Sequence, residues 1–550
     1  MKNRFKNYFD KKLFPDLKAG IITAVVALPL AIAFAIASGV PPIMGLYTAI
    51  IAGILGSAFG GSKYSITGPT GAMTVIILST VNKFGIEGLL LAGFLAGLIQ
   101  LIFGFGGFGR FVKYIPFPIV SGFTAGIGVI IFVGQVPNFL GLVLKPKEFI
   151  VETIEEIALD VGLADVGAVI IALSTLAMLY FLPAILSKNK LTKNIPASLI
   201  ALLVSTSAAV FFLPLIPVVG DIPSGFPSVS LINFNLELVK NVLPSAFTIA
   251  LLGSIESLLC AVVCDGMTNS KHKSNKELKG QGLANVVLPF FGGIPATAAI
   301  ARSAVNIREG AKTKMAGIYH ALVLLLIVLF LGPYAKFIPK AFLAGILMFV
   351  SIKMVNLDEF KTIARISRAD TLVLGITFLL TVLTDLVFAV QAGMFLAIFL
   401  LFVNLSKIID ISHMEEFDKK NGINKKIYSN EKLRDLVSVY TIHGPFFFGA
   451  MNVFDRKINE HMHIKKPHII LRMKYVPFID STGIIRLNEF ISERARENCH
   501  VYLTGIQKKT EEKLFKDKEF RHLLPKEHIF GSTQEAIEYV EKKIAGQTLL

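Results

Sequence analysis

The sequence is poor in charged residues and in cysteine. Only 17% of its 550 residues are charged, and the mean hydropathy is +0.64. Soluble domains carry about 25% charged residues, so we expect most of this chain to face lipid. Three cysteines are too few for a disulfide framework. Cys260 and Cys264 have no nearby His or third Cys in the sequence, so we interpret this pair as contributing to helix packing rather than to a metal site.

Acidic residues are scarcer than basic ones, and the formal net charge is +16. The basic residues lie in short loops and at the two ends of the chain, which is typical of topology signals and argues against nucleic-acid binding. The first apolar run, residues 20–37, lacks a cleavage site and is expected to be a retained helix. The apolar part also lacks a nucleophile–base pair or a metal cluster. The sequence therefore predicts neither an enzyme nor a cofactor.

Between Asp16 and Lys407 the chain has about fourteen apolar segments. We place them at residues 18–38, 44–59, 65–80, 87–107, 115–140, 165–186, 197–217, 241–264, 282–292, 294–307, 314–332, 338–351, 371–386 and 391–407. Most are long enough to cross a bilayer, which takes about 20 residues.

Two segments are too short to cross. Residues 65–80 read SITGPTGAMTVIILST, residues 294–307 read IPATAAIARSAVNI, and each follows a Gly-Gly pair. Paired half-segments at matching places in two halves of a membrane protein indicate a transporter binding site.

Loop charge predicts the orientation. If the N-terminus is cytoplasmic, most loop Lys and Arg residues fall on the inside, including those at 188–193 and 271–279. Seven segments end by Pro217 and seven begin at Asn241, so the second set enters from the opposite side. We therefore predict an inverted repeat of seven plus seven segments.

The tail changes character. VSVYTIHGPFFFG, HIILRMKYVPFID and HVYLTG look like strands, and polar helical stretches alternate with them, including a closing helix over residues 532–543. This pattern predicts a small α/β domain. We divide the chain into a cytoplasmic segment 1–17, a membrane domain 18–409, a linker 410–432 and the α/β domain 433–545.

The two half-helices suggest the chemistry. A helix that begins inside the membrane exposes unpaired N–H groups and a partial positive charge, which suits an anion. The small residues around Thr70 and Thr297 permit close approach, and their hydroxyls can donate; tight helix packing is the alternative explanation. Neither half-helix begins with an acidic residue.

Two charged residues lie within apolar segments. Arg302 would supply positive field beside the anion, or would extend towards the cytoplasm with the Arg308 loop. Glu256 is a carboxylate well inside a predicted helix, and burial would allow it to carry a proton. A structural salt bridge between Glu256 and Arg302 is the other interpretation. Asp265 and Asp385 lie near helix ends, where solvent accounts for them.

The chain resembles the SulP anion transporters, which include sulfate permeases, bicarbonate transporters and the prestin group. The resemblance rests on PDLKAGIITAVVALPLAIAFAIASGVPPIMGLYTA, GPTGAMTV and NKELKGQGLANVVLPFFGGIPATAAIARSAVNIREG, and on IDSTG in the tail, which resembles a STAS domain. It implies fourteen helices in inverted repeats, a core and a gate domain, and a homodimer. It places the substrate between the third and tenth helices, with Phe34 lining the pocket.

The chain departs from the family pattern at several places. Leu30 stands where many sulfate-type members have Gln, and this difference argues against a strict specificity for sulfate. Glu256 and Cys260 stand where sodium-coupled bicarbonate members have Asp and Thr, and residues 298–300 replace their sodium-binding Gly-Ala-Thr. By resemblance, Glu at this position is typical of members thought to use protons.

We therefore expect proton-coupled sulfate uptake by alternating access in the plasma (inner) membrane, with both ends of the chain cytoplasmic. Sodium- or proton-coupled uptake of bicarbonate or a dicarboxylate, and channel-like conductance regulated by the STAS domain, are the alternatives. Glu256 is the expected proton carrier. The expected substrate-binding residues are Phe34, Thr70, Gly71, Ala72, Thr297, Ala298, Ala299, Ala301 and Arg302.

In the tail, Ser481 follows Asp480 as the phosphorylated serine of STAS anti-sigma antagonists does. That resemblance implies a phosphosite at Ser481. A helix N-cap explains the Asp480–Thr482 sequence as well, and we favour the cap.

Overall fold

The computed structural model describes residues 12–110, 116–144, 147, 150–189, 192, 195–222, 225–226, 229, 231–232, 234–384, 386–407, 410–413, 431–461 and 466–547. Most of the predicted segment 1–17, most of the predicted linker 410–432, and Asp385 lie outside these residues. The chain forms two compact units, Met1–Phe395 and Leu396–Leu550, and the division falls within α16 (Leu386–Lys407).

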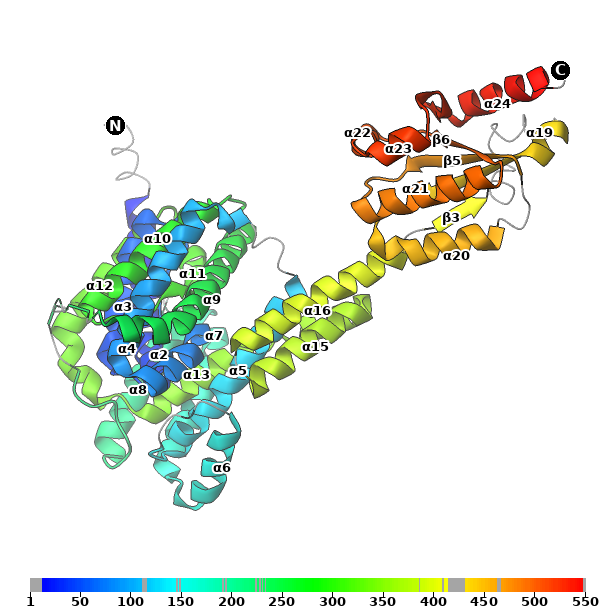
Figure 1. Cartoon of the computed structure of the whole chain (residues 1–550). Helices are drawn as coiled ribbons and strands as arrows, with labels where there is room; N and C mark the ends of the chain where they lie inside the picture. The colour runs from blue at the N-terminus through cyan, green and yellow to red at the C-terminus, as the bar shows by residue number, and fades with distance from the viewer. Residues whose placement is uncertain are drawn as a thin grey trace, which may run out of the picture. The chain divides into compact units, whose positions relative to one another are not determined.

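The first unit is almost entirely helical (Figure 1). Besides α16, its described elements are α2 (Leu13–Ala37), α3 (Pro42–Phe59), β1 (Thr67–Gly68), α4 (Gly71–Phe105), η1 (Phe108–Arg110), α5 (Phe117–Leu140), α6 (Ile150–Asp160), η3 (Val161–Leu163), α7 (Val166–Leu186), α8 (Ala197–Phe212), α9 (Leu236–Thr268), α10 (Ser274–Val287), η4 (Leu288–Phe291), β2 (Thr297–Ala298), α11 (Ile300–Arg308), α12 (Met315–Leu331), η5 (Gly332–Phe337), α13 (Lys340–Met354), α14 (Leu357–Ile366) and α15 (Arg368–Leu383).

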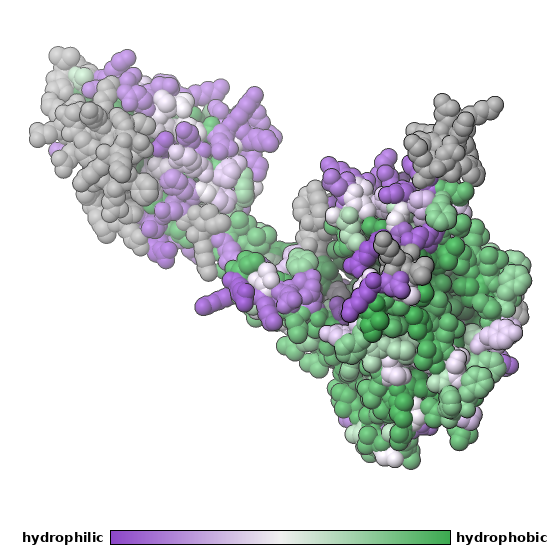
Figure 2. Space-filling model, turned by 180° about the vertical axis from the view of Figure 1, so that it is seen from behind, coloured by the Kyte–Doolittle hydropathy of each residue, from purple (hydrophilic) through white to green (hydrophobic). Residues whose placement is uncertain are grey.

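Among the described residues, nine helices are long and apolar enough to cross a membrane. The longest, α4, holds two predicted segments, because Gly85 interrupts it with a left-handed conformation (φ 68°) that glycine adopts readily. Each predicted segment coincides with helix, but some limits were wrong. The segment predicted at residues 282–292 begins at Ser274, because the first turns of α10 are polar. Figure 2 shows the broad apolar surface of this unit.

Several helix ends gather on one side of this unit. The buried carboxylate of Asp16, at the start of α2, accepts hydrogen bonds from the backbone N–H groups of Lys312 (2.6 Å) and Thr313 (3.0 Å), which precede α12. Buried Glu277, near the start of α10, accepts from the N–H of Gly61 (2.6 Å), just after α3. Helices α3, α10 and α12 pack side by side (Figure 1). These contacts place the start of α2 and the end of α3 at the same membrane surface.

The second unit is an α/β domain. Its elements are β3 (Asp410–His413), α19 (Glu431–Leu436), β4 (Val437–His443), η6 (Phe448–Ala450), α20 (Met451–His461), β5 (His468–Tyr475), α21 (Ser481–Arg496), β6 (His500–Thr504), α22 (Lys508–Leu514), α23 (Lys518–Leu523), η7 (Lys526–His528), β7 (Ile529–Phe530) and α24 (Thr533–Gln547). The three predicted strands are confirmed as β4, β5 and β6. The sheet order is β3-β4-β5-β6-β7, parallel except for β3.

Apolar side chains cover both faces of this sheet. Leu471 faces a core with Phe490 of α21, whereas Ile470 faces a second core with Ile537 of α24. This alternation follows from the two-residue period of a strand. A strand buried on both faces is continuously apolar, which is why β5 begins with the run HIIL.

A histidine cluster lies at one end of the sheet. His468 is buried, its ring stacks on His500 with 5.5 Å between centroids, and its Nδ1 is 3.2 Å from the hydroxyl of Tyr502. Burial, with the added repulsion of His500 and Lys543, lowers the pKa of His468 to about 4. Burial also lowers the pKa of His528. The folded domain therefore favours the neutral form of His468 and His528.

Candidate functional site

The starts of the two half-helices are joined by a small β-pair. Strand β1 pairs antiparallel with β2, with Thr67 opposite Ala298 and Gly68 opposite Thr297. Helix α4 begins three residues after β1, and α11 begins two residues after β2. Because the two strands run in opposite directions, the two helices leave this point in opposite directions.

Neither helix start is capped by a side chain. The N-cap positions are Thr70 for α4 and Ala299 for α11, and within these described segments neither receives a side-chain cap. The first N–H groups of a helix have no partner inside it, and they carry the positive end of the helix dipole. Ile300 is 41% exposed and Ala301 is also exposed. The start of α11 is therefore open to a bound anion.

Glu256 of α9 lies beside both strand ends. The hydroxyl of Thr70 donates a hydrogen bond to its carboxylate (2.9 Å), and Thr297 is a second side-chain partner. The next residue, Ser257, accepts a hydrogen bond from the N–H of Ala298 (3.1 Å). Glu256 is half-buried. One turn of α9 thus contacts both half-segments.

Arg302 of α11 is 1% exposed and points inward. Its Nη2 donates a hydrogen bond of 2.7 Å to the carbonyl of Pro69, whereas its Nη1 is buried without a partner. Gly68 makes room for the guanidinium, since a Cβ there would lie 2.6 Å from Nη1. Arg302 therefore places a positive charge beside the extended residues Gly68 and Pro69, which lead into α4.

This burial does not agree with the interpretation that Arg302 extends towards the cytoplasm. The predicted alternative of a salt bridge between Glu256 and Arg302 is also absent from the ion pairs of the described residues. The two charged groups have different hydrogen-bond partners, so each is available to a third species.

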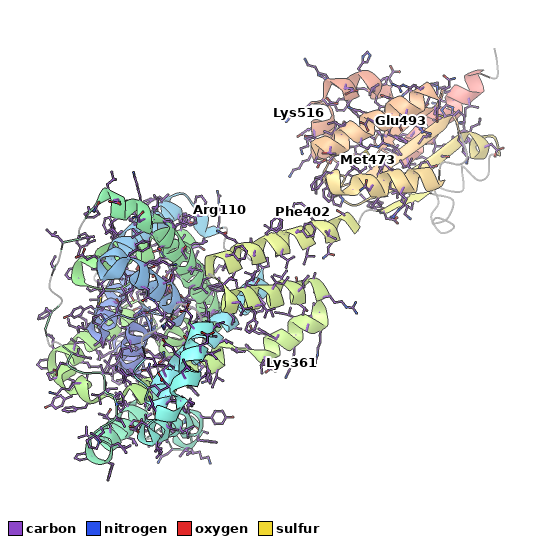
Figure 3. All side chains as sticks on the ribbon, turned by 60° about the horizontal axis from the view of Figure 1, so that its bottom comes forward. Arg110, Lys361, Phe402, Met473, Glu493 and Lys516 are labelled. Carbon is purple, nitrogen blue, oxygen red and sulfur yellow. The ribbon has the colours of Figure 1, made fainter. Side chains whose placement is uncertain are left out.

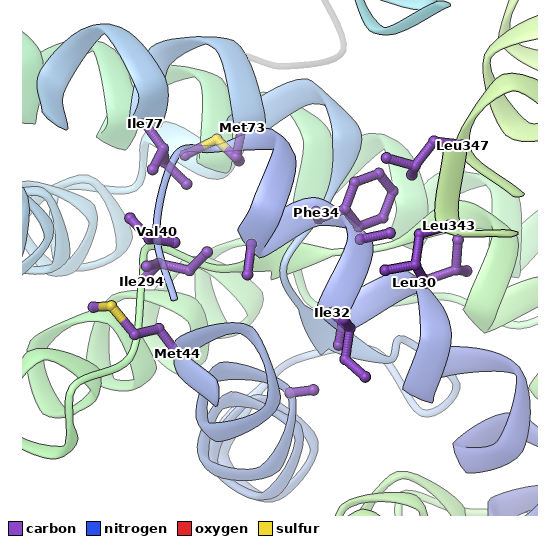
Figure 4. Close-up of a cluster of buried hydrophobic side chains, with 14 of the residues drawn as sticks. Leu30, Ile32, Phe34, Val40, Met44, Met73, Ile77, Ile294, Leu343 and Leu347 are labelled. Carbon is purple, nitrogen blue, oxygen red and sulfur yellow. The ribbon is translucent and has the colours of Figure 1, made fainter. Parts of the chain in front are cut away.

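Phe34 lies on the other side of the start of α4. Its ring is 3.3 Å from the position that a Cβ on Gly71 would take, and Ile131 of α5 is 2.8 Å from that position. Figure 4 shows Phe34 facing Leu343 and Leu347 of α13. The start of α4 is thus packed between Phe34 of α2 and Ile131 of α5.

A cavity of about 310 Å³ extends from this region between α2, α4 and α5. Thr74 and Val75 of α4 line it, and so does Ile131, the residue that contacts Gly71. Lys340 also lines it, as do Lys147 and Glu156, which form an ion pair (2.6 Å). The cavity thus borders the residues next to the start of α4.

The predicted substrate residues fall into two groups. Phe34, Thr70, Gly71, Thr297, Ala298, Ala299 and Arg302 are buried, whereas Ala72 is half-buried and Ala301 is exposed. The β1–β2 pair brings the members from residues 70–72 and 297–302 together. Phe34 joins them through its contact with Gly71.

Our sequence reasoning missed the polar residues that hold the unwound chain before α11. Asn285 of α10 bonds both the N–H (2.8 Å) and the carbonyl (3.0 Å) of Ala296, and Thr48 of α3 accepts from the N–H of Ile294 (2.7 Å). Backbone groups inside a membrane need such partners. Gln281 and Asn285, four residues apart in an apolar segment, are the signal that could have revealed this role.

The two cysteines of α9 take part in packing. Cys260 and Cys264 are buried against Ala298, and the thiol of Cys260 donates to the hydroxyl of Ser303 (3.2 Å). Across the described ranges, no group of three His, Cys, Asp or Glu residues could hold a metal ion. The packing interpretation of this pair agrees with these contacts.

In the α/β domain, Asp480 is the N-cap of α21. Its carboxylate accepts hydrogen bonds from the N–H of Gly483 (2.8 Å) and of Phe448 (3.1 Å). Ser481 is the first residue of the helix, and it is exposed. The predicted cap is confirmed.

Two opposed half-helices with uncapped starts, a buried arginine and a half-buried glutamate are the features of a membrane carrier for a small anion, and the same chain also contains an α/β domain. Comparisons with known proteins agree with this class. Residues 13–377 match the sulfate permease family, and residues 428–536 match the STAS domain. The chain belongs to the sulfate permease family, and it is an anion transporter.

Similar proteins cover nearly the whole chain. It is 40% identical over 539 residues to "Putative sulfate transporter YvdB" of Bacillus subtilis, covering 97% of this chain and 98% of that protein. It is 31% identical to the bicarbonate transporter BicA of Picosynechococcus, covering 95% and 94%. The solved structure of SLC26A9 has the same fold, with a TM-score of 0.86 at 19% identity over 98% of this chain and 92% of that one.

Proposed function

We propose that the protein takes up a small oxyanion, sulfate first, together with a proton. The observation that carries this proposal is the contact of Glu256 with both half-segments, through Thr70 and Thr297, beside two uncapped helix starts. The N–H groups and Arg302 would hold the anion. Glu256 would bind the proton and thereby offset the charge of the substrate.

The enclosure of the site supports alternating access. The half-helices belong to elements that pack with α9, whereas Gly71 meets Ile131 of α5 and Phe34 faces α13. We propose that a core with the half-helices moves against a gate with α5 and α13, in an inverted-repeat homodimer. The membrane is the inner membrane, with the N-terminus and the STAS domain cytoplasmic.

Purified protein in liposomes tests this proposal. Labelled sulfate, bicarbonate and a dicarboxylate are offered with an inward proton gradient, with a sodium gradient at clamped pH, and without a gradient. We expect the proton gradient to drive accumulation of sulfate. If none of the three anions accumulates under any gradient, the proposal is wrong.

Two variants separate the coupling from the binding. Glu256→Gln keeps the shape of the side chain but cannot release a proton, so gradient-driven uptake should be lost while anion exchange persists. Glu237→Gln, at the exposed start of the same helix, is the control and should behave as wild type. Unchanged gradient dependence in Glu256→Gln would remove this residue from the coupling.

Sodium-coupled bicarbonate uptake is the second candidate, and the similarity to BicA over 95% of the chain favours it. Accumulation of bicarbonate with a sodium gradient at clamped pH would establish it.

For the STAS domain, we propose Ser481 as a regulatory phosphosite on the strength of its exposure. Uptake by Ser481→Asp that equals that of Ser481→Ala would contradict regulation at this residue.

A further inference from the structure

A second cavity lies apart from the anion site, at the membrane surface where α3 and α4 end and α10 begins. Its volume is about 880 Å³. The described residues that line it are Phe59, Leu101, Phe105, Arg110, Lys273, Ser274, Asn275, Lys276, Lys279 and Leu283. The site described above contributes none of these residues. This cavity is therefore a separate place on the molecule.

The polar part of this cavity is basic. Arg110, Lys273, Lys276 and Lys279 all contribute to the wall, and its described lining holds no carboxylate. The nearest acidic residue in the sequence, Glu277, is buried and bound to the backbone of residues 61–62. The cavity therefore attracts an anion.

Two contacts hold this basic wall in shape. The N–H of Gly109 donates a hydrogen bond to the side chain of Asn275 (2.9 Å), which fixes η1 against the start of α10. The ammonium of Lys279 lies 3.9 Å above the ring centroid of Phe105. Arg110 lies at the edge of the first unit (Figure 3). The charges thus come from two elements that are joined to each other.

The rest of the wall is apolar and continues along the membrane-facing side of α4. Leu101, Phe105 and Leu283 line the cavity, and Phe105 is 73% exposed. Ile102 and Leu98, one and two turns back along the helix, are 64% and 38% exposed. A soluble anion would use only the basic part, whereas a lipid with a charged headgroup would use both parts.

We propose that this cavity binds an anionic phospholipid. Its phosphate lies among Arg110, Lys273, Lys276 and Lys279, and one acyl chain lies along Leu98, Ile102 and Phe105 of α4. Basic pockets between membrane helices recognise such headgroups, and each Lys or Arg contributes favourably to binding. The proposal is independent of the proposed transport function.

Native mass spectrometry of the full chain in detergent tests this proposal. The protein is titrated with phosphatidylglycerol, with phosphatidylcholine of the same acyl chains, and with soluble glycerol phosphate as a competitor. We expect phosphatidylglycerol to bind more tightly than phosphatidylcholine, and glycerol phosphate not to displace it. Equal binding of the two lipids, or displacement by glycerol phosphate at concentrations like those of the lipid, would overturn the proposal.

Matched variants locate the lipid. Lys273→Gln with Lys276→Gln should weaken phosphatidylglycerol binding about 25-fold, because each lysine near an anionic lipid contributes about fivefold. The control carries Lys361→Gln with Arg365→Gln, two exposed basic residues of α14, away from Arg110 (Figure 3). It should bind as wild type. If the first variant is poorly folded, Lys279→Gln replaces it, and wild-type affinity in the folded variant would contradict the proposal.

Discussion

The sharpest structural prediction concerns Gly68, which gives Arg302 its position. A methyl group added at residue 68 would lie 2.6 Å from Nη1, 3.2 Å from Nη2 and 3.3 Å from the Cα of Ala49. The backbone at Ala49 has little freedom to yield, so the guanidinium must move. Gly68→Ala therefore breaks the hydrogen bond of 2.7 Å from Arg302 to the carbonyl of Pro69.

The expected cost has three parts. Loss of a hydrogen bond to a charged group costs about 1.5–3 kcal/mol, and overpacking a filled site costs about 1–3 kcal/mol. Alanine recovers about 0.5–1 kcal/mol because it loses less backbone freedom than glycine on folding. The net destabilisation is about 2–5 kcal/mol, which lowers the melting midpoint by about 2–6 °C because a unit of this size has a large unfolding entropy.

The chain offers a direct assay for this loss. It has no tryptophan, but Cys260, Cys264 and Cys499 are all buried, so a thiol-reactive dye reports unfolding on heating. Gly375→Ala is the control, because nothing lies within 4 Å of a Cβ at that position of α15. We expect a lower midpoint and weaker anion uptake in Gly68→Ala alone. Wild-type midpoint and uptake in that variant would refute our account of Arg302.

Two further predictions test other parts of the chain. The folded domain lowers the pKa of His468 from 6.5 to about 4, so folding favours the neutral ring. The stability that this preference contributes is fully present above pH 6.5. About 3 kcal/mol of it is lost as the pH falls towards 4, because the unfolded chain then binds the proton more tightly. In the wild type, the hydrogen-exchange protection of β5 should fall as the pH is lowered from 7.5 to 5. This fall should be smaller in His468→Asn, and it should be as large as in the wild type in the exposed control His522→Gln. Glu277→Ala should cost about 1–3 kcal/mol of stability and so lower the melting midpoint, because the N–H groups of Gly61 and buried Ser62 lose their acceptor. The same change at exposed Glu237 should have no such effect.

Hydropathy predicted the helices of the membrane unit well, because lipid-facing segments are long and apolar. It did not place the start of α4 at Gly71 or of α11 at Ile300, since hydropathy averaged over a segment does not separate a few extended residues from the helix that follows them. The β1–β2 pair was also missed. Strands of two residues are too short to show a period.

The candidate site shows a similar limit. Residue type and segment position were enough to select Glu256 and Arg302. Their partners were not predictable, because the carbonyl of Pro69 and the hydroxyl of Thr70 reach them only after distant segments pack together. The polar residues of α10 left a visible signal in the sequence, but only the structure shows which backbone groups they bind.

We propose that the transported anion lies at the start of α11, and the reactivity of a cysteine at residue 301 tests this position directly. Ala301 is exposed, whereas the three natural cysteines are buried, so Ala301→Cys should be the main target of a polar thiol reagent. The account predicts that the transported anion slows this reaction, and that labelling blocks uptake. Thr362→Cys on exposed α14 should react at the same rate with and without the anion. If saturating substrate leaves the rate at residue 301 unchanged, the anion does not bind there.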